Sequence, residues 1–329
     1  MSAAIPVGIA GLGSYAPERV VPNSYFEDRV DTSDEWIVQR TGIRERRWVA
    51  EGENTSHMCV AAARRALEAA SIDARELDMI VIGTVSPDQY VPACAPLVQR
   101  AIGASNAVAW DVNSACTGFL TALDTASAFI ASGRVKRALV LGAETLSRFI
   151  DMDDRASCIL FGDAAGAAVV MPHADCGQGE ILKLVQGCDG TGYEFIQMPA
   201  GGSREPASTA TVAAHDHALR VRGREVFRFA VERMGAIVRE MLAGHDLAQL
   251  GLIVPHQVNK RIIDAALGKL DVPPEKIVVN IERYGNTSAA SIPLALDEAW
   301  REGRLEQDKL VVMAAFGAGL TWGGALLRW

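Results

Sequence analysis

The stretch that decides the fold is Asp111-Val-Asn-Ser-Ala-Cys116-Thr-Gly-Phe119. It follows an apolar run at 107–110, which predicts a strand, and it opens an alanine-rich amphipathic segment that reaches Ser132 and predicts a helix. Cys116 should therefore lie at the turn from a strand into a helix. Because a helix N-terminus presents unpaired N–H groups and a positive dipole, we expect it to hold the pKa of Cys116 below the free value of about 8.5. This position is typical of a nucleophile, whereas a cysteine that only packs in the core is the alternative.

Strands and helices alternate along the chain on both sides of this stretch. Apolar positions at 56–70 recur with the period of a helix, and 77–82 is a continuous apolar run, as in a buried strand. The alternation predicts an α/β fold. The other expected elements are a first strand at 7–13, a loop-rich segment to Arg47 with a short helix capped by Thr32 or Ser33, and strands at 107–112, 138–141 and 162–170.

The second half of the chain repeats features of the first. The matches are Cys116-Thr117 with Asn286-Thr287, Gly133-Arg134 with Gly303-Arg304, Val140-Leu141 with Leu310-Val311, and the apolar run 77–81 with 250–254. We therefore expect two halves, residues 1–172 and 173–329, each with loops at the ends of its central strands, where open α/β sheets place their sites. In this alignment His256 follows a strand, and Asn286 opens a helix after another strand. Residues 189–217, rich in glycine, serine and alanine, are expected to cross one face of the molecule.

The composition limits the class of protein. With 329 residues, of which 49% are hydrophobic, the chain can bury a large core. The six cysteines are scattered through apolar segments without zinc-like spacing, which fits a reducing compartment, and no metal site is expected. No apolar run is long enough to span a membrane, and the first residues lack the charge of a signal peptide, so we expect a cytoplasmic protein without a membrane partner. A net charge of −8 argues against a nucleic-acid partner.

Cys116, His256 and Asn286 are candidates for one catalytic cluster, because each is expected just after a strand end. A thiolate can carry an acyl group as a thioester, and neutral His and Asn side chains can both donate hydrogen bonds to a developing enolate oxygen. No Asp or Glu stands at either partner position to act as a base. Taken singly, a histidine is more often structural and an asparagine before Thr287 is often only a helix cap. Their matching places in the two halves favour the catalytic interpretation.

Six motifs, in this order, resemble the β-ketoacyl-ACP synthase III family, whose members are initiating condensing enzymes. The resemblance runs from about residue 5 to the C-terminus and implies a thiolase-like α/β fold, with two halves related by a pseudo-two-fold axis in layers ordered α, β, α, β, α. The Cys-His-Asn triad indicates decarboxylative condensation; plant-type chalcone synthases share it, but the loop at 34–37 resembles the initiating synthases. The motifs are Asp34-Glu-Trp-Ile, Asn113-Ser-Ala-Cys-Thr-Gly, Phe161-Gly-Asp-Ala-Ala-Gly-Ala, Pro255-His-Gln-Val-Asn, Gly285-Asn-Thr-Ser-Ala-Ala and Ala315-Phe-Gly-Ala-Gly-Leu-Thr-Trp-Gly.

The resemblance implies an acyltransferase that joins an acyl-CoA primer to malonyl-ACP through an acyl-cysteine and releases a 3-oxoacyl-ACP, with no cofactor. Cys116 would take the acyl group, and its own backbone N–H and that of Ala318 would form the oxyanion hole. His256 and Asn286 would stabilise the enolate that forms as carbon dioxide leaves. Coenzyme A would be bound by Thr32, Trp36, Arg40, Arg155 and Asn259. Of these, Trp36 and Arg155 would stack on its adenine. From the residues alone, Trp36 is equally well explained as core and Arg155 as part of a loop ion pair.

The sequence departs from the family pattern at two places. One of them concerns the acyl pocket, which the resemblance implies includes Phe316. Ala318 stands where the family often has a glycine, and its methyl group would narrow the acyl tunnel, or strain the backbone if φ is positive there. The second departure is Gly162-Asp163-Ala164, which ends in alanine instead of glycine. The resemblance also implies a homodimer in which Val91 forms the floor of the partner's pocket. Its small side chain would admit a longer or branched primer.

Basic residues near 220–228 predict a surface for the acidic carrier protein. An ordinary solvated face explains them nearly as well. Arg224 and Arg228 lie four apart on one side of an expected helix, while Val226, Phe227, Ala230 and Val231 are expected to turn inward. The residues of the candidate patch are Arg224, Arg228, Lys260, Arg261 and Lys269.

A second class of function fits the same cysteine. Relatives of this fold pass acyl groups to an alcohol or amine without decarboxylation, and others bind substrates without any chemistry. The intact Cys-His-Asn set argues against binding alone. It argues less strongly against transfer, because His256 could deprotonate an acceptor hydroxyl.

Overall fold

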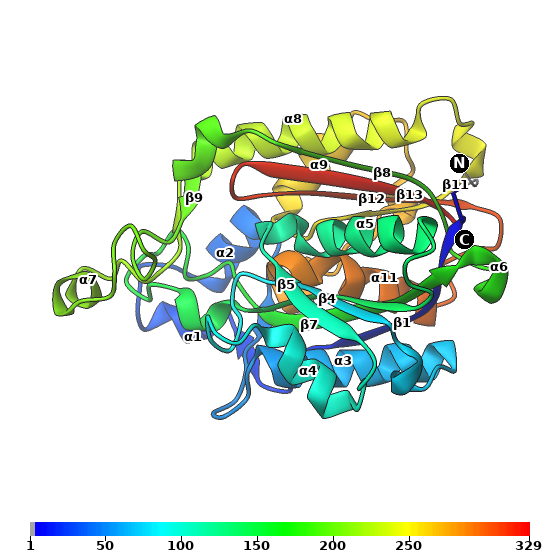
Figure 1. Cartoon of the computed structure of the whole chain (residues 1–329). Coiled ribbons are helices and arrows are strands. Elements are labelled where there is room, and N and C mark those ends of the chain that lie inside the picture. The colour runs from blue at the N-terminus through cyan, green and yellow to red at the C-terminus, as the bar shows by residue number, and fades with distance from the viewer. Residues whose placement is uncertain (1–3) are drawn as a thin grey trace.

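One mixed sheet of nine strands organises the molecule (Figure 1). The computed structural model describes residues 4–329. Across the sheet the strands are, in order, β11 (Leu250–Pro255), β12 (Leu310–Gly317), β13 (Thr321–Arg328), β8 (Glu180–Cys188), β1 (Val7–Tyr15), β7 (Asp163–Pro172), β6 (Ala138–Thr145), β4 (Met79–Gly83) and β5 (Val108–Val112). The strands expected from the apolar runs in both halves are thus confirmed.

The sheet consists of two similarly built parts. Strands β4-β6-β7-β1 form one and β11-β12-β13-β8 the other; in each, the first pair is parallel and the next two pairs are antiparallel. The parts meet at β1 and β8, where Gly8 pairs with Glu180. A parallel bridge between Ile253 and Ile277 stands beside β11 as β5 stands beside β4. We propose that the halves divide at residues 172 and 173, where β7 ends.

Helices and sheet parts stack in five layers, as the resemblance implied (Figure 1). Two helices fill the space between the sheet parts, and a pair of helices covers the outer face of each part. The inner helices are α5 (Gly118–Ala131) and α11 (Ser291–Arg301). Outside one part, α3 (Thr55–Ala70) covers β1 and β7 and α4 (Cys94–Ile102) lies beside it on β4 and β5; outside the other, α8 (Gly223–Leu242) covers β12 and β13 and α9 (Lys260–Leu267) packs beside α8. Three main apolar clusters occupy the interfaces between these layers.

Glycines at two positions allow the inner helices to approach the strands closely. A Cβ atom on Gly83, the last residue of β4, would lie 2.2 Å from the backbone carbon of Gly118 at the start of α5. A Cβ atom on Gly142 of β6 would lie 2.2 Å from the backbone oxygen of Ala289, just before α11. Both distances are far inside van der Waals contact, so any larger residue at either position would push the turn away from the sheet. The turns that carry the candidate catalytic residues therefore lie directly on the strands.

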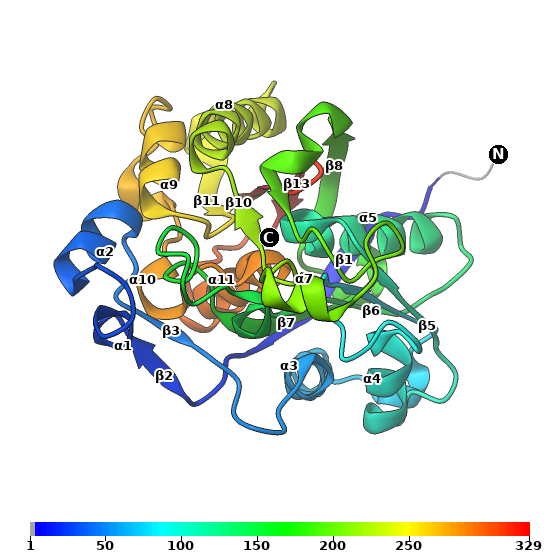
Figure 2. The same cartoon turned by 90° about the vertical axis from the view of Figure 1, so that its left-hand side faces the viewer.

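Shorter elements surround one end of the sheet (Figure 2). Ser33 caps α2 by accepting a hydrogen bond from Trp36 N, as expected for one of the two predicted caps. Residues 189–217 form an excursion that carries α7 away from the body of the molecule (Figure 1). These elements are β2 (Val20–Pro22) paired with β3 (Glu45–Arg47), β9 (Ile196–Gln197) paired with β10 (Arg220–Val221), α1 (Ser24–Glu27), α2 (Asp34–Thr41), α7 (Thr209–Ala213) and α10 (Ile281–Tyr284). The short helix α6 (His173–Cys176) lies at the opposite end, where β7 ends (Figure 1).

The prediction that a strand precedes Asn286 is wrong. The short helix α10 stands there, and Asn286 itself forms an isolated bridge with Phe161. The matching residues of the two turns are Ala115 and Ser288, which have φ values of 47° and 49° and each begin a three-residue 3₁₀ turn. Asn286 precedes Ser288 in its turn, whereas Cys116 follows Ala115 in the other turn, so Asn286 and Cys116 are not at equivalent positions. The alignment failed because it matched side chains, whereas the repeat is one of backbone conformation.

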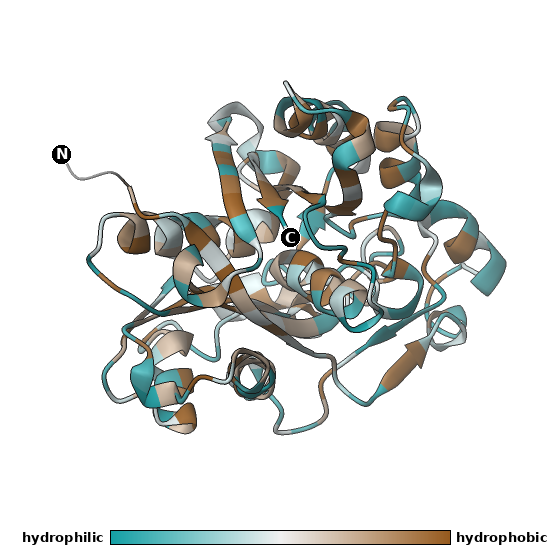
Figure 3. Cartoon of the chain, turned by 90° about the vertical axis from the view of Figure 1, so that its right-hand side faces the viewer, coloured by the Kyte–Doolittle hydropathy of each residue, from teal (hydrophilic) through white to brown (hydrophobic). Residues whose placement is uncertain are grey.

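Apolar residues follow the layers (Figure 3). The central strands are mostly brown or pale in the hydropathy colouring, and teal gathers on outer loops and outward helix faces. This is the distribution expected when strands are covered by helices on both faces. None of the helices in residues 4–329 combines the length and apolar character needed to cross a membrane.

Candidate active site

A cavity of about 600 Å³ opens where strands of both sheet parts end. Its walls include residues that directly follow the carboxyl ends of β4, β5, β6, β11 and β12, which is where α/β sheets place their ligands. The excursion and the start of α8 close its other side. Cys116, His256 and Asn286 all line this cavity, so the structure brings the three predicted catalytic residues together.

Cys116 lies in the 3₁₀ turn at 115–117 that leads from β5 into α5. Gly317, at the end of β12, lies against it: a Cβ atom there would be 2.7 Å from Cys116 N. The expected low pKa is wrong for the cavity as it stands. Burial raises the pKa of Cys116 to about 12, with a smaller raising effect from the Glu144 carboxyl, while a hydrogen bond from Ser288 lowers it. Removal of water from the thiolate outweighs the favourable polar contacts at this turn.

His256 follows β11 directly and is fully buried. Its Nδ1 lies 2.7 Å from Ser291 Oγ, and within residues 4–329 its Nε2 has no hydrogen-bond partner. The Phe316 ring packs edge-on against the imidazole with its centroid 5.6 Å away, and also lines the cavity. Burial lowers the pKa of His256 from 6.5 to about 3, so the ring is neutral near pH 7. A neutral imidazole held in this way presents one unused nitrogen to the cavity.

Asn286 is fixed through its backbone and its side chain. Its N–H donates to Leu160 O at 2.8 Å, and its own carbonyl accepts from Gly162 N at 3.0 Å. Its Oδ1 accepts a hydrogen bond from Ser288 N at 2.8 Å. Because the amide oxygen is used in this way, the amide nitrogen is the end of the side chain left to act as a donor.

Ala318 lines the same cavity as Cys116. Among the described non-glycine residues with positive φ, Ala318 does not occur, so its methyl group causes none of the backbone strain considered from the sequence. Its carbonyl accepts a hydrogen bond from Thr321 Oγ1 at 3.1 Å, which holds the turn between β12 and β13. The backbone N–H groups assigned to the oxyanion hole therefore belong to residues at one end of one cavity.

Four of the residues predicted to bind coenzyme A, namely Trp36, Arg40, Arg155 and Asn259, lie together beside the cavity. The Arg155 guanidinium lies 4.3 Å above the Trp36 ring and that of Arg40 lies 5.5 Å from it, and these three side chains do not line the cavity. Asn259 does line it, and its Nδ2 donates to Arg40 O at 3.2 Å. The Thr32 hydroxyl is buried and unpartnered within residues 4–329. Arg155 also forms an ion pair with Asp31 at 3.3 Å. A loop ion pair was the alternative explanation for Arg155.

Val91 is strongly exposed in the single chain, at 85%, and does not line its own cavity. Its neighbour Tyr90 is 75% exposed and does line it. Strand β5 forms the edge of the sheet nearby, and its Val108 is 56% exposed. The chain thus carries exposed apolar side chains next to an unpaired strand edge.

The candidate basic patch is exposed, with two corrections. Arg224, Arg228, Arg261 and Lys269 are exposed, and none of them forms an ion pair within residues 4–329. Lys260 does pair with Asp264 at 2.6 Å, because both lie one turn apart on α9. Phe227 does not turn inward as expected: it is 37% exposed at the cavity mouth, 6.0 Å from the Arg261 guanidinium. The Phe227 ring therefore lines the apolar cavity and is not buried in the core beneath α8.

Sequence reasoning missed three polar residues around the triad: Glu144, Ser288 and Ser291. Glu144 ends the apolar run of β6 and is fully buried, and burial raises its pKa to about 7. A lone acidic residue at the end of an apolar strand was the available signal. The two serines follow Asn286 in a run that also reads as an ordinary helix start, and the sequence holds no sign of which side chains they contact.

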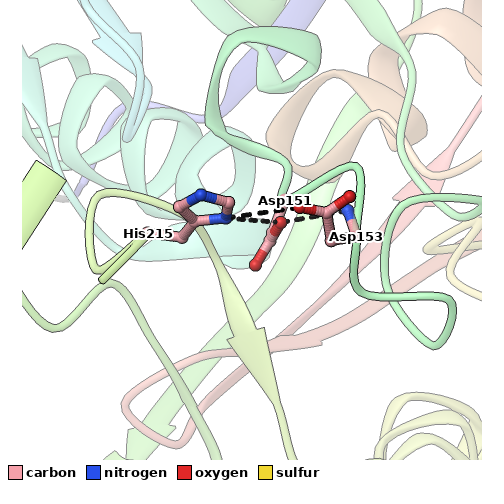
Figure 4. Close-up of side chains that lie close together, drawn as sticks. All are labelled: Asp151, Asp153 and His215. Atoms are coloured by element: carbon pink, nitrogen blue, oxygen red, sulfur yellow. Dashed lines mark hydrogen bonds and ion pairs between the residues drawn. The ribbon is translucent and has the colours of Figure 1, made fainter. Parts of the chain in front are cut away.

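A second polar cluster lies at the base of the excursion (Figure 4). His215 Nδ1 lies 3.0 Å from Asp151 Oδ1 and 3.9 Å from Asp153 Oδ2, and Arg220 approaches Asp151 at 3.8 Å. Leu219 N also donates to Phe149 O at 2.8 Å. These contacts tie the excursion to the loop after β6.

Comparisons with known proteins agree on one family. Two family models match the chain, both described as 3-oxoacyl-[acyl-carrier-protein (ACP)] synthase III: one over residues 110–190, and its C-terminal counterpart over 242–329. A β-ketoacyl-[acyl-carrier-protein] synthase III of Desulfitobacterium hafniense is 49% identical over 327 residues, which is 99% of this chain and 98% of the relative. The crystal structure of the 3-oxoacyl-[acyl-carrier-protein] synthase III of Aquifex aeolicus matches with a TM-score of 0.89 and 43% identity, over 98% of this chain and 100% of that one. The priming β-ketosynthase of the R1128 polyketide pathway matches with a TM-score of 0.90 and 38% identity, over 100% and 98%.

Proposed function

The chain belongs to the β-ketoacyl-ACP synthase III family, and from this premise we propose that Cys116, His256 and Asn286 perform its condensation at the cavity where the two sheet parts end. The family assignment and the thiolase-like fold predicted from the motifs are confirmed. The protein is a condensing acyltransferase of the type that initiates fatty acid synthesis. The roles of single residues and the binding of each substrate are proposed from the geometry of the cavity.

In the first half-reaction, the Cys116 sulfur attacks the thioester carbonyl of an acyl-CoA. A new bond forms between Sγ and the acyl carbon while the bond from that carbon to the coenzyme A sulfur breaks, and the proton lost from Sγ balances the one gained by coenzyme A, which is released as its thiol. The carbonyl oxygen becomes negative at the tetrahedral stage, and we assign the N–H groups of Cys116 and Ala318 to stabilise it. Both residues line the cavity, which supports this role.

In the second half-reaction, malonyl-ACP loses carbon dioxide, and the electrons of the broken bond pass to an enolate. His256 Nε2–H and the Asn286 amide donate hydrogen bonds to the enolate oxygen, and the carbanion attacks the acyl-Cys116 carbonyl. The bond from that carbonyl carbon to Sγ then breaks, the 3-oxoacyl-ACP is released, and the Cys116 thiolate takes up a proton from solvent. The observation that carries this proposal is that both donors are fixed from behind, by Ser291 and Ser288, while their free ends remain available at the cavity that holds Cys116. Preorganised donors of this kind need no rearrangement as charge develops.

Coenzyme A is proposed to lie on the side of the cavity formed by α2 and α9. A planar adenine can stack between the Trp36 ring and the Arg155 guanidinium, which already face each other. Arg155 would leave Asp31 to admit the base. Asn259, which joins Arg40 to the cavity wall, supports this placement, and the buried hydroxyl of Thr32, just before α2, is unpartnered within residues 4–329.

The carrier protein is proposed to dock on the exposed cations of α8 and α9. Arg224, Arg228, Arg261 and Lys269 carry positive charge that no described acidic side chain neutralises. Phe227 and Val226 from the same helix line the cavity, so a carrier on this surface would deliver its thioester through the adjacent mouth. The family name itself includes the acyl carrier protein.

A homodimer is proposed in which β5 edges meet and Val91 reaches the partner's cavity. The exposure of Val91, Tyr90 and Val108 supports this, because exposed apolar side chains beside an unpaired edge are typical of a covered surface. The cytoplasmic location expected from the sequence stays a prediction, as does the expected independence of any cofactor.

Mass spectrometry of the intact protein with acyl-CoA and malonyl-ACP tests the proposal. We expect an acyl adduct that maps to Cys116, followed by release of carbon dioxide and appearance of a carrier-bound product extended by two carbons. If the protein loads acyl groups but never decarboxylates malonyl-ACP or malonyl-CoA, and instead acylates an alcohol or amine, the acyltransferase alternative replaces condensation. An adduct on another cysteine would remove Cys116 from its role.

A further inference from the structure

Glu144 is a buried carboxyl group that the proposed reaction leaves unused. It lies near the carboxyl end of β6, is fully buried, and accepts hydrogen bonds from neutral donors alone within residues 4–329. Burying an ionisable group without a cation is costly, so a carboxyl placed here needs an explanation. Ser86 Oγ at 2.5 Å and Thr84 Oγ1 at 3.3 Å donate to Oε2, and Val85 N lies 3.2 Å from Oε2 and 3.3 Å from Oε1. The segment that follows β4 thus fixes the carboxyl group in place.

Ser288 connects this fixed carboxyl group to a catalytic side chain of the second half. Its Oγ donates to Glu144 Oε1 at 3.2 Å, and its backbone N–H donates to Asn286 Oδ1 at 2.8 Å. Within residues 4–329, the bond from Ser288 N is the one hydrogen bond of the Asn286 side chain. Because it occupies the amide oxygen, it leaves the amide nitrogen as the donor at the cavity. The direction of the Ser288 N–H therefore sets the direction of the Asn286 amide.

The backbone of Ser288 has a conformation that needs support. Its φ of 49° lies in the left-handed region, which is unfavourable for residues other than glycine and persists where the surroundings hold it. The matching residue of the first half, Ala115, has a φ of 47° but no hydroxyl, and its turn packs against Gly317. At Ser288, the hydrogen bond to Glu144 joins the turn to a strand of the other half. This side-chain contact holds the left-handed conformation of Ser288.

We propose, building on the function above, that Glu144 is a positioning residue for the decarboxylation of malonyl-ACP. It holds Ser288 in its left-handed conformation, and the Ser288 N–H in turn aims the Asn286 amide at the enolate oxygen. A carboxylate suits this role because both of its oxygens accept hydrogen bonds and neither donates. An amide in its place would direct its NH2 group at the Val85 N–H in either orientation, since that N–H lies near both oxygens. Glu144 does not line the cavity, so it acts through Ser288.

The test is the rate of carbon-dioxide release from malonyl-ACP, measured at pH 8 in a Cys116→Ala background. The thiol is then absent, and the pH lies above the Glu144 pKa of about 7, so the carboxyl group is ionised. Glu144→Gln and Ser288→Ala should each lower kcat about 10-fold and leave KM for malonyl-ACP within about twofold. The double variant should be no slower than the slower single variant, because both changes break the same contact. Additive losses, or a change in KM alone, would overturn the proposal.

Ser288→Gly separates the role of the backbone from that of the hydroxyl. Glycine adopts a positive φ without support, so this variant should release carbon dioxide at least about threefold faster than Ser288→Ala. Adding Glu144→Gln to Ser288→Gly should cause no further loss. Equal rates in Ser288→Gly and Ser288→Ala would show that the hydroxyl does not act through the backbone and would overturn the proposal. This comparison decides the question even where Glu144→Gln does not fold.

The chain holds a matched control pair outside the cavity wall. Ser14 Oγ donates to Asp297 Oδ2 at 2.6 Å, both side chains are buried, and this contact also joins the two halves. Neither residue lines the cavity. Ser14→Ala and Asp297→Asn should leave carbon-dioxide release within about twofold of the Cys116→Ala parent; losses equal to those at Glu144 and Ser288 would reduce the proposed positioning to a general effect of a lost buried contact. A parent that releases no carbon dioxide, or that is unaffected by Asn286→Ala, would instead count against the proposed function.

Discussion

Ser291 Oγ lies 2.7 Å from His256 Nδ1, and both atoms are buried. If the hydroxyl donates to Nδ1, the neutral ring carries its proton on Nε2, which is the nitrogen left unpartnered at the cavity. Ser291→Ala should therefore lower the rate of malonyl-ACP decarboxylation by about 10-fold, because the donor tautomer is no longer selected. A carbon-dioxide release assay measures this, with acyl loading as the internal reference. Ser127→Ala, which removes a buried serine that bonds only Leu123 O on its own helix, should leave decarboxylation at the wild-type rate.

The triad predicts a split between the two half-reactions. Cys116→Ala should abolish acyl loading yet still release carbon dioxide from malonyl-ACP, because that step uses the enolate donors and not the thiol. His256→Ala and Asn286→Ala should load acyl groups and lose about 100- to 1,000-fold in decarboxylation. Asn286→Asp keeps the shape but sets a negative charge beside the enolate, so it should also fail to decarboxylate. Equal loss of both half-reactions in these variants would contradict the separation of roles.

Acid should destabilise the protein through His256. Its pKa is about 3 when folded and 6.5 as the ordinary value, so below pH 6.5 the unfolded chain binds a proton that the native state does not. The contribution is fully present above pH 6.5 and is lost as the pH falls toward 3. Between about pH 7.5 and 5.5, the free energy of unfolding of the wild type should fall by about 1.4 kcal/mol more than that of His256→Ala. Urea unfolding at the two pH values checks this; parallel losses in both proteins would remove His256 as the cause.

The basic patch should act on the carrier protein alone. Charge reversal in the double variant Arg228→Glu and Arg261→Glu should raise KM for malonyl-ACP several-fold at low salt, with less effect at high salt, and should spare acyl-CoA loading. Arg239→Glu is the matched control, because Arg239 is an exposed cation in the last turn of the same helix α8, away from Phe227. A wild-type KM in the double variant would place carrier docking elsewhere.

Primer length should depend on Val91 if the partner's cavity receives it. Val91→Phe should shorten the longest acyl-CoA that loads efficiently, because a larger ring would occupy the floor of the partner's pocket. The measurement is the loading rate across a series of acyl-CoA lengths, together with the mass of the assembly in solution. Val212→Phe enlarges another exposed valine, on α7, and should leave the profile unchanged. The same profile in both variants would remove Val91 from the pocket.

Much of the candidate site could be predicted from the sequence, because its residues lie next to regular strands and helices. The turn at Cys116 follows from an apolar strand run and an alanine-rich helix run on either side of it, and the place of His256 follows from the end of the run at 250–255. The sequence also contains Gly83, Gly142 and the small residues of the turns. These residues allow the turns to lie directly on the strands. Local pattern and chain order were enough for these features.

The sequence by itself thus determined the alternating α/β pattern, the candidate triad and, through its motifs, the family. The tertiary structure alone decided the surroundings of each group: the match of Ala115 with Ser288 instead of Cys116 with Asn286, the outward turn of Phe227 into the cavity, and the contact of Glu144 with a turn 144 residues further along the chain. It also reversed the expected direction for the Cys116 pKa, from below the ordinary value to about 12. The physical reason is the same in each case, since desolvation and side-chain contacts depend on which distant segments pack together, and local periodicity carries no information about that.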